Sequence, residues 1–461
     1  MIRLSVLFGF WLLMFSPAVF AQNVSERVRD AYQRFELDSQ LSSAISSLYV
    51  INAKTGAIVF EKNARIGLAP ASTQKIITSV TAFELLGPAF RYVTELGFSG
   101  SLNEGTLEGN IVVRPSGDPT FGSWRWKETG DEYIISKFSN RIKNSGVHNI
   151  HGSVIIQSQY ERSQLFPDGW IMQDIGNYYG AGSSYLNWRE NQFEVYLNSG
   201  SVIGDPVTIT GYKPRIYGQD YKSLIVSARP GSGDNAYIYH HPNLIRGTIP
   251  VNEKRFVISG SIQNPPWQFQ KGLNDTLRHI GVDMREAVQV DYDSTLDFTL
   301  MEAHYSPPLD SIIYWFNKKS INLYGESLVK TLSVKNGGNG STEDGLDRLR
   351  SFWKENGVSE KELNMSDGSG LSPLNRVTTH AQVEILKYAK SRKWFLQFYH
   401  SLPEYNGMAV KSGTISDVKG FCGYHKAKDG TEYILSFLVN NYNGRSSSLV
   451  GKMFKVMDEL K

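Results

Sequence analysis

The chain has 461 residues and carries 48 lysine and arginine residues against 45 aspartate and glutamate residues, a formal net charge of +3. This near balance argues against a globally basic nucleic-acid binder, and a hydrophobic share of 41% argues against wholesale disorder. The single cysteine, Cys422, excludes an intramolecular disulfide framework and any metal or iron–sulfur site built from several cysteines. The length corresponds to roughly two to four domains.

Residues 1–21 have the pattern of a secretory signal peptide. Arg3 supplies a positive start, residues 4–14 form an apolar stretch shorter than a membrane span needs, and Val19-Phe-Ala21 is a small-residue cleavage site. An uncleaved N-terminal anchor is the alternative interpretation. No later stretch is long and apolar enough to cross a bilayer. We therefore expect an exported, periplasmic protein with no integral membrane span once the signal is removed.

The first elements of the mature chain alternate helix and strand. Apolar residues at helical spacing predict a helix over 25–37, and strands are predicted over 47–52 and 57–61 with a turn between them. A further helix, with an apolar stripe from Ile76 to Leu86, follows Pro70 and ends at Gly87-Pro88.

From about Arg91 to Asp297 the sequence pattern changes. Short strand-like runs alternate with glycine, asparagine and aspartate turns, which predicts a mainly β region of one or two lobes. His240-His241 is read as a surface pair because the two residues are adjacent and lack a metal-binding spacing. The predicted strands are 110–114, 153–157, 193–197, 207–210, 223–227, 237–240 and 255–259.

Helical periodicity returns after Pro308. Apolar stripes predict helices around 309–316, 323–332, 342–356 and 379–391, then strands at 408–410, 420–425 and 433–440, and a closing helix at 449–460. The outer parts of the chain are therefore mixed α and β, whereas the middle is mostly β. The simplest plan is one α+β domain interrupted by a β insertion.

A serine and a lysine three residues apart form the first candidate reactive pair. Ser72-Thr-Gln-Lys75 stands at the predicted start of a helix, where this spacing puts both side chains on one face. A lysine in a partly desolvated pocket can lose its proton and act as a base for the serine. The pattern S-x-x-K is weak alone, since it begins at Ser72, Ser327, Ser351 and Ser416.

The same chemistry needs a second hydroxyl, an amide and a cation. Ser320-Ile-Asn322 lies between two predicted helices, whereas Ser101-Leu-Asn103 is followed by Glu-Gly and reads as a hairpin turn. Lys411-Ser-Gly413 lies in a predicted strand and can hold a substrate carboxylate, whereas Lys54-Thr-Gly56 reads as a structural turn. The order Ser72, Ser320, Lys411, each in its expected local structure, is much more specific than any one motif.

This ordered set resembles the active site of the penicillin-recognising serine enzymes. The flanking residues resemble one branch, the D-Ala-D-Ala carboxypeptidase/endopeptidase family, or class C low-molecular-mass penicillin-binding proteins of the penicillin-binding protein 4 type. These flanking residues are Pro70-Ala-Ser-Thr-Gln-Lys75, Tyr179-Gly-Ala181 and Ser366-Asp-Gly-Ser-Gly-Leu-Ser372. The gap from Ser72 to Ser320 is 248 residues. The resemblance runs from about Ser47 to the C-terminus.

The resemblance implies a fold and a domain plan. It implies an α+β protein with a serine β-lactamase/transpeptidase-like domain formed by residues 22–90 and 296–461. Residues 91–295 would be a large, mainly β insertion of two nested lobes, domains II and III. The sequence departs from the family in three places: Ser412 replaces a usual threonine, Pro373 an arginine found in many members, and Gly325 a usual alanine.

The resemblance also implies residue roles. Ser72 attacks the carbonyl between two D-alanines with Lys75 as its base, and the N–H groups of Ser72 and Thr414 form the oxyanion hole. Ser320 relays a proton to the leaving amine, and Asn322 holds the acyl-side amide. The terminal carboxylate binds to Lys411, Ser412 and Thr414. Asp174 lies near the pocket for the diamino acid of the stem peptide, or is simply a loop carboxylate at a turn.

The implied substrates are peptidoglycan stem peptides ending in D-Ala-D-Ala, with β-lactams as inhibitors. No metal, cofactor or nucleic acid is implied. One alternative is a β-lactamase or esterase on the same fold, which the long insertion disfavours. Another is a non-catalytic peptidoglycan-binding protein, which the intact set of motif residues disfavours. Cys422, in a predicted strand near Lys411, reads as a small buried hydrophobic residue.

Overall fold

The computed structural model describes residues 23–157, 164–284, 288–291 and 298–461. The expected signal peptide, residues 1–21, lies outside these ranges. Among the helices that are described, none has both the length and the apolar character needed to cross a membrane.

One six-stranded antiparallel sheet joins the two ends of the chain. The strand order is β18-β19-β20-β21-β1-β2, and β1 pairs with β21 along its whole length, from Ile45 opposite Asn440 to Asn52 opposite Tyr433. N-terminal and C-terminal segments therefore share one sheet. The strands are β1 (Ile45–Asn52), β2 (Ile58–Lys62), β18 (Glu404–Tyr405), β19 (Met408–Ile415), β20 (Val418–Lys426) and β21 (Glu432–Asn440).

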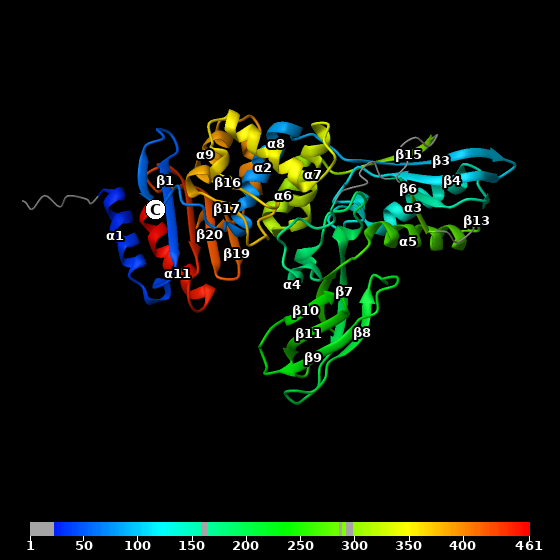
Figure 1. Cartoon of the computed structure of the whole chain (residues 1–461), viewed down its shortest axis with the longest axis horizontal. Coiled ribbons are helices and arrows are strands. Elements are labelled where there is room, and N and C mark those ends of the chain that lie inside the picture. The colour runs from blue at the N-terminus through cyan, green and yellow to red at the C-terminus, as the bar shows by residue number, and fades with distance from the viewer. Residues whose placement is uncertain (1–22, 158–163, 285–287, 292–297) are drawn as a thin grey trace, which may run out of the picture.

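Helices cover both faces of this sheet (Figure 1). The two terminal helices, α1 (Val24–Glu36) and α11 (Ser446–Met457), pack on one face around Tyr32, Phe437 and Met453. The opposite face carries a larger core around Ile76, Phe316 and Trp353. Its helices are α2 (Lys75–Leu86), α6 (Leu309–Lys319), α7 (Asn322–Lys335), α8 (Thr342–Glu355), α9 (Thr379–Lys390) and α10 (Phe395–Ser401).

The inserted region forms a second, seven-stranded sheet. Its entering strand β3 and leaving strand β15 are antiparallel neighbours, from Val93 opposite Tyr305 to Phe98 opposite Thr299. Two helices, α3 (Asp131–Asn144) and α5 (Pro265–His279), contribute to its core. The strands are β3 (Val93–Asn103), β4 (Thr106–Arg114), β5 (Asn149–Ile150), β6 (Val154–Gln157), β13 (Asp283–Met284), β14 (Val288–Asp291) and β15 (Thr299–Tyr305).

Two three-stranded sheets are nested inside this insertion and share a separate core. Figure 1 shows them projecting below the rest of the molecule, beside the short helix α4 (Met172–Ile175). One sheet contains β7 (Gln192–Asn198), β8 (Thr208–Lys213) and β12 (Phe256–Ser261), and the other β9 (Lys222–Ala228), β10 (Asn235–His240) and β11 (Asn243–Pro250). The expected α+β class with a large, mainly β insertion is confirmed.

Two expectations for the insertion need correction. The helices α3 and α5 were not expected in this region. The reading of His240-His241 as a surface pair is wrong for His240, which is buried between the hydroxyls of Tyr221 at 3.0 Å and Ser261 at 2.8 Å. Burial lowers the pKa of His240 to about 4, so its ring is neutral at ordinary pH.

Candidate active site

Ser72 lies on a tight turn rather than on the α-helix itself. The turn is a 3-10 helix, Ala71–Gln74, which leads directly into α2. The hydroxyl of Thr73 donates to the carbonyl of Pro70 at 2.7 Å and fixes the turn. Ala71 has a φ of 45°, a conformation that costs an L-residue on the order of 1 kcal/mol and clusters at functional sites.

Lys75 occupies a buried position beside this serine. Its ammonium donates to Ser72 Oγ at 3.0 Å, to Asn322 Oδ1 at 2.7 Å and to the carbonyl of Ser369 at 2.6 Å, so all three donors are used. Burial lowers the pKa of Lys75 to about 7, against smaller opposing effects from Asp367 and Glu326. Near neutral pH, Lys75 is therefore often deprotonated and able to take the proton of Ser72.

Ser320 and Asn322 lie at the junction of α6 and α7. Ser320 ends α6 in the left-handed conformation, with a φ of 56°, and Asn322 begins α7. The amide nitrogen of Asn322 donates to the carbonyl of Tyr179 at 2.7 Å while its oxygen accepts from Lys75. This pair of bonds fixes the orientation of the Asn322 amide.

β19 brings Lys411 and its neighbours against the serine turn. Lys411 is buried, and its ammonium donates to the carbonyl of Ser412 at 2.9 Å. Burial lowers its pKa well below the usual value, and the neighbouring charge of Lys75 lowers it further. A Cβ atom on Gly413 would lie 2.5 Å from the oxygen of Pro70 and 3.0 Å from the nitrogen of Ser72. Only glycine allows the strand to approach the turn this closely.

The predicted residues meet around one cavity of about 440 Å³. Ser72, Ser320, Asn322, Thr414 and Asp174 all line it. Lys75 reaches it through its bond to Ser72. Lys411 and Ser412 share β19 with Thr414 but are not lining residues. The structure therefore brings together residues that lie more than 300 positions apart in the sequence.

Asp174 lies on α4 at the insertion side of the cavity, next to Tyr178, Tyr179 and Tyr237. Burial raises its pKa, and a hydrogen bond from Tyr179 opposes that shift. A carboxylate among aromatic rings is suited to a cationic group, because the rings and the charge both attract an ammonium.

Three further residues lie at the candidate site. Lys319 and Glu326 were missed in the sequence, and Asp367 was noted only within the run 366–372, without a role. Lys319 lines the cavity with an exposed cation next to Ser320. Glu326, buried on α7, accepts the N–H of Gly368 at 2.9 Å, and burial raises its pKa to about 8. Asp367 anchors the loop that places the Ser369 carbonyl under Lys75. A charged residue inside an apolar helical stripe was the only sequence signal for Glu326.

Comparison with known proteins identifies the family. The family model of the D-Ala-D-Ala carboxypeptidase 3 (S13) family matches residues 29–404. The chain belongs to the S13 family. One relative is the Haemophilus influenzae protein named D-alanyl-D-alanine carboxypeptidase DacB, 24% identical over 369 residues, which are 79% of this chain and 74% of the relative. The Actinomadura D-alanyl-D-alanine carboxypeptidase is 24% identical over 443 residues, covering 88% and 80% of the two chains.

Solved structures confirm the fold expected for an S13 protein. The crystal structure of penicillin-binding protein 4 from Haemophilus influenzae matches with a TM-score of 0.79 at 21% identity, covering 94% of this chain and 98% of that one. A second crystal structure of that protein, complexed with a β-lactam, matches with a TM-score of 0.74 at 20% identity and the same coverage. The S13 fold, a transpeptidase-like domain with extra sheets, is thus shared across nearly the whole chain.

Proposed function

We propose that this S13 protein is a serine-type D-alanyl-D-alanine carboxypeptidase or DD-endopeptidase whose nucleophile is Ser72. One observation carries the assignment of roles. Lys75, whose pKa lies near 7, contacts Ser72 Oγ at 3.0 Å on the wall of a cavity that also contains Ser320, Asn322 and Thr414. A serine paired with a neutral amine is an activated nucleophile.

In the proposed acylation step, Ser72 Oγ attacks the carbonyl carbon between the two D-alanines and gives its proton to Lys75 Nζ. The N–H groups of Ser72 and Thr414 stabilise the oxyanion, which the contact of Gly413 with the serine turn supports. The C–N bond then breaks, and Ser320 Oγ relays a proton to the departing amine. Water hydrolyses the resulting ester and returns Ser72 to its starting state.

Asn322, Lys411, Ser412, Thr414 and Asp174 are the proposed substrate-binding residues. Asn322 holds the acyl-side amide, and the cation of Lys411 with the hydroxyls of Ser412 and Thr414 binds the terminal carboxylate. The substrate carboxylate favours the charged form of Lys411. A charged Lys411 in turn keeps Lys75 neutral, so carboxylate binding would help to activate the serine. Asp174 would meet the ammonium of a diamino acid in the stem peptide.

The substrate and location of the protein are part of the same proposal. The substrates are peptidoglycan stem peptides ending in D-Ala-D-Ala, and β-lactams acylate Ser72 by imitating that end. The β-lactam complex of the Haemophilus relative supports this inhibition. Export to the periplasm follows from the signal-like residues 1–21. The catalytic domain comprises residues 22–90 and 296–461, and residues 91–295 form the inserted domains.

Labelled penicillin tests the assignment of Ser72. The mature protein is incubated with the label, digested, and the adduct is mapped by mass spectrometry. We expect one adduct, on Ser72, which Ser72→Ala abolishes. A label elsewhere, or one that survives Ser72→Ala, would contradict the proposal. Release of D-alanine from pentapeptides, compared with cleavage of cross-linked muropeptides, then separates carboxypeptidase from endopeptidase activity.

A further inference from the structure

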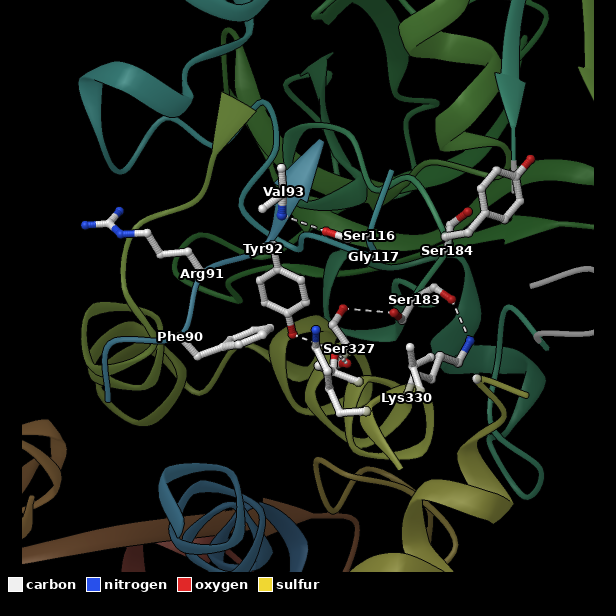
Figure 2. A pocket seen from close by; sticks show the side chains of 15 residues that line it. Phe90, Arg91, Tyr92, Val93, Ser116, Gly117, Ser183, Ser184, Ser327 and Lys330 are labelled. Atoms are coloured by element: carbon white, nitrogen blue, oxygen red, sulfur yellow. Dashed lines mark hydrogen bonds between the residues drawn. The ribbon is translucent and has the colours of Figure 1, made fainter. Parts of the chain in front are cut away.

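A second cavity, of about 160 Å³, lies between α7 and the inserted region (Figure 2). We call it the Lys330 cavity. Its wall is formed by the segment 90–93 that leads into β3, the segment 183–185, and the second half of α7. None of its described lining residues also lines the cavity that contains Ser72. None of the proposed catalytic steps uses it.

The charges of the Lys330 cavity favour an anion. Among the described residues, its charged lining residues are Arg91, Lys330 and Lys335, and none is acidic. The Arg91 guanidinium points away from the cavity in Figure 2 and donates to the carbonyl of Ser306, so the two lysines supply the charge. The Lys330 side chain is buried, and its ammonium donates to the carbonyls of Ser183, at 2.7 Å, and Gln164. An ammonium has three donors, so within the described residues one donor remains for a ligand. Burial lowers the pKa of Lys330 to about 8, which leaves it mostly charged at pH 7.

The remaining lining residues favour a ligand whose anionic group is attached to an apolar ring or chain. Figure 2 shows the ring of Tyr92 between the Phe90 ring and the serine side chains. Hydroxyls in the wall are paired with each other, Tyr92 with Thr331 at 2.8 Å and Ser183 with Ser327 at 2.8 Å. A cavity of about 150 Å³ holds one benzene ring. The Lys330 cavity therefore has room for a single ring or a short aliphatic chain.

Both elements that hold Asn322 also contact the Lys330 cavity. α7 carries Asn322 in its first turn and Lys330 two turns later. The carbonyl of Tyr179, which accepts from Asn322, lies four residues before Ser183. A ligand that shifts either element would therefore move the Asn322 amide, and with it the acceptor for Lys75.

We propose that the Lys330 cavity is a second binding site, for a small carboxylate with one ring or a short aliphatic body, and that its occupancy changes acylation at Ser72. The carboxylate binds the ammonium of Lys330, Lys335 adds a cation at the exposed rim, and the apolar body packs against Phe90 and Tyr92. The binding site stands independently of the proposed function, whereas the effect on acylation rests on it.

Benzoate is the probe for binding, and benzamide is its uncharged control of equal shape. Calorimetry is carried out on protein already acylated by penicillin, so that benzoate cannot enter the Ser72 cavity. We expect a dissociation constant in the millimolar range, on the order of 1 mM, as for a ligand of so few atoms, and at least tenfold weaker binding of benzamide. Lys330→Met should remove this preference for benzoate. Equal binding of both probes, or none, would overturn the proposal.

A cavity-filling variant separates this site from the active site. Val334→Phe places a ring in the cavity wall, and Val334→Ala is the matched control that leaves the cavity open. We expect benzoate to change the penicillin acylation rate at least twofold in the wild type and in Val334→Ala but not in Val334→Phe. If the effect persists in Val334→Phe, benzoate acts elsewhere and the proposal is wrong. Labelling of Ser72 without benzoate tests the proposed function separately.

Discussion

Replacing Asn322 by aspartate tests whether Lys75 is the base. The Asn322 oxygen lies 2.7 Å from Lys75 Nζ, so Asn322→Asp places a carboxylate in direct contact with the amine. Opposite charges within about 4–6 Å favour the charged form of each group and shift a pKa by about 1–3 units. The pKa of Lys75 should therefore rise from about 7 to between about 8 and 10.

This shift has a defined kinetic signature. In the proposed mechanism acylation needs neutral Lys75, so the wild-type rate should rise with pH and level off above about 7. In Asn322→Asp the midpoint should move up by the same roughly 1–3 units. At pH 7 wild-type Lys75 is about half neutral, so the rate should fall by about five- to five-hundred-fold, with recovery at high pH. The measurement is the second-order rate of acylation by labelled penicillin from pH 5 to 10.

Asn322→Ala is the matched control, because it removes the amide without adding charge. It should lower the rate at every pH and leave the midpoint near or below 7, since Lys75 loses an acceptor that stabilised its charged form. Melting temperatures establish that both variants are folded. If the pH midpoint of acylation is the same in Asn322→Asp as in the wild type, Lys75 does not set the pH dependence and the mechanism is refuted.

Three further predictions concern close contacts and buried groups of the fold. Gly413→Ala puts a Cβ 2.5 Å from the Pro70 oxygen, so we expect at least a hundredfold loss of penicillin acylation; a near-normal rate would contradict the contact. Arg125→Met leaves the buried Glu190 carboxylate without its 2.7 Å ion pair, so urea unfolding should show a loss of about 3 kcal/mol, which adding Glu190→Gln should partly restore. The thiol of Cys422, buried and with a raised pKa, should react with Ellman's reagent only after unfolding, and Cys422→Ala should retain acylation.

Much of the fold could be predicted because local patterns agree with the final structure. The helix predicted at 25–37 is observed at Val24–Glu36, and the strand predicted at 433–440 is observed at Glu432–Asn440. The hairpin reading of Ser101-Leu-Asn103 is confirmed, since β3 ends at Asn103 and β4 starts at Thr106. Burial of Cys422 is likewise confirmed. These features depend on periodicity and turn chemistry, which neighbouring residues determine.

The missed helix α5 shows where such patterns fail. Pro265-Pro266 resembles a break, yet proline is well tolerated in the first turn of a helix, and the side chain of Asn264 caps that turn by accepting from Trp267 at 3.2 Å. Polar residues then occupy buried positions of the helix, among them Gln270, which bonds to the carbonyl of Val154. The apolar stripe of α5 is therefore interrupted in the sequence, although the polar residues that interrupt it are buried in the folded core.

The candidate site was predictable as a set of motifs but not as an electrostatic arrangement. Ser72, Ser320 and Lys411 were each recognisable by their neighbours in the sequence. Their proximity depends on the pairing of β1 with β21, which brings the two ends of the chain into one sheet. The pKa of Lys75 depends on burial by α7 and the 366–372 loop, and no local pattern contains that information.

Lys75 keeps a low pKa although two acidic groups, Asp367 and Glu326, lie near it. Asp367 accepts five N–H bonds, two of them from Gln74 and Trp170 in distant parts of the sequence, so the fold holds its carboxyl group in place. The donors are Gln74 Nε2, Gly370 N, Asn375 Nδ2, Trp170 Nε1 and Ser372 N. Burial and the charge of Asp367 raise the pKa of Glu326 to about 8, so Glu326 is mostly neutral at pH 7. Since neither acid forms an ion pair with Lys75, burial dominates and the amine stays available as a base.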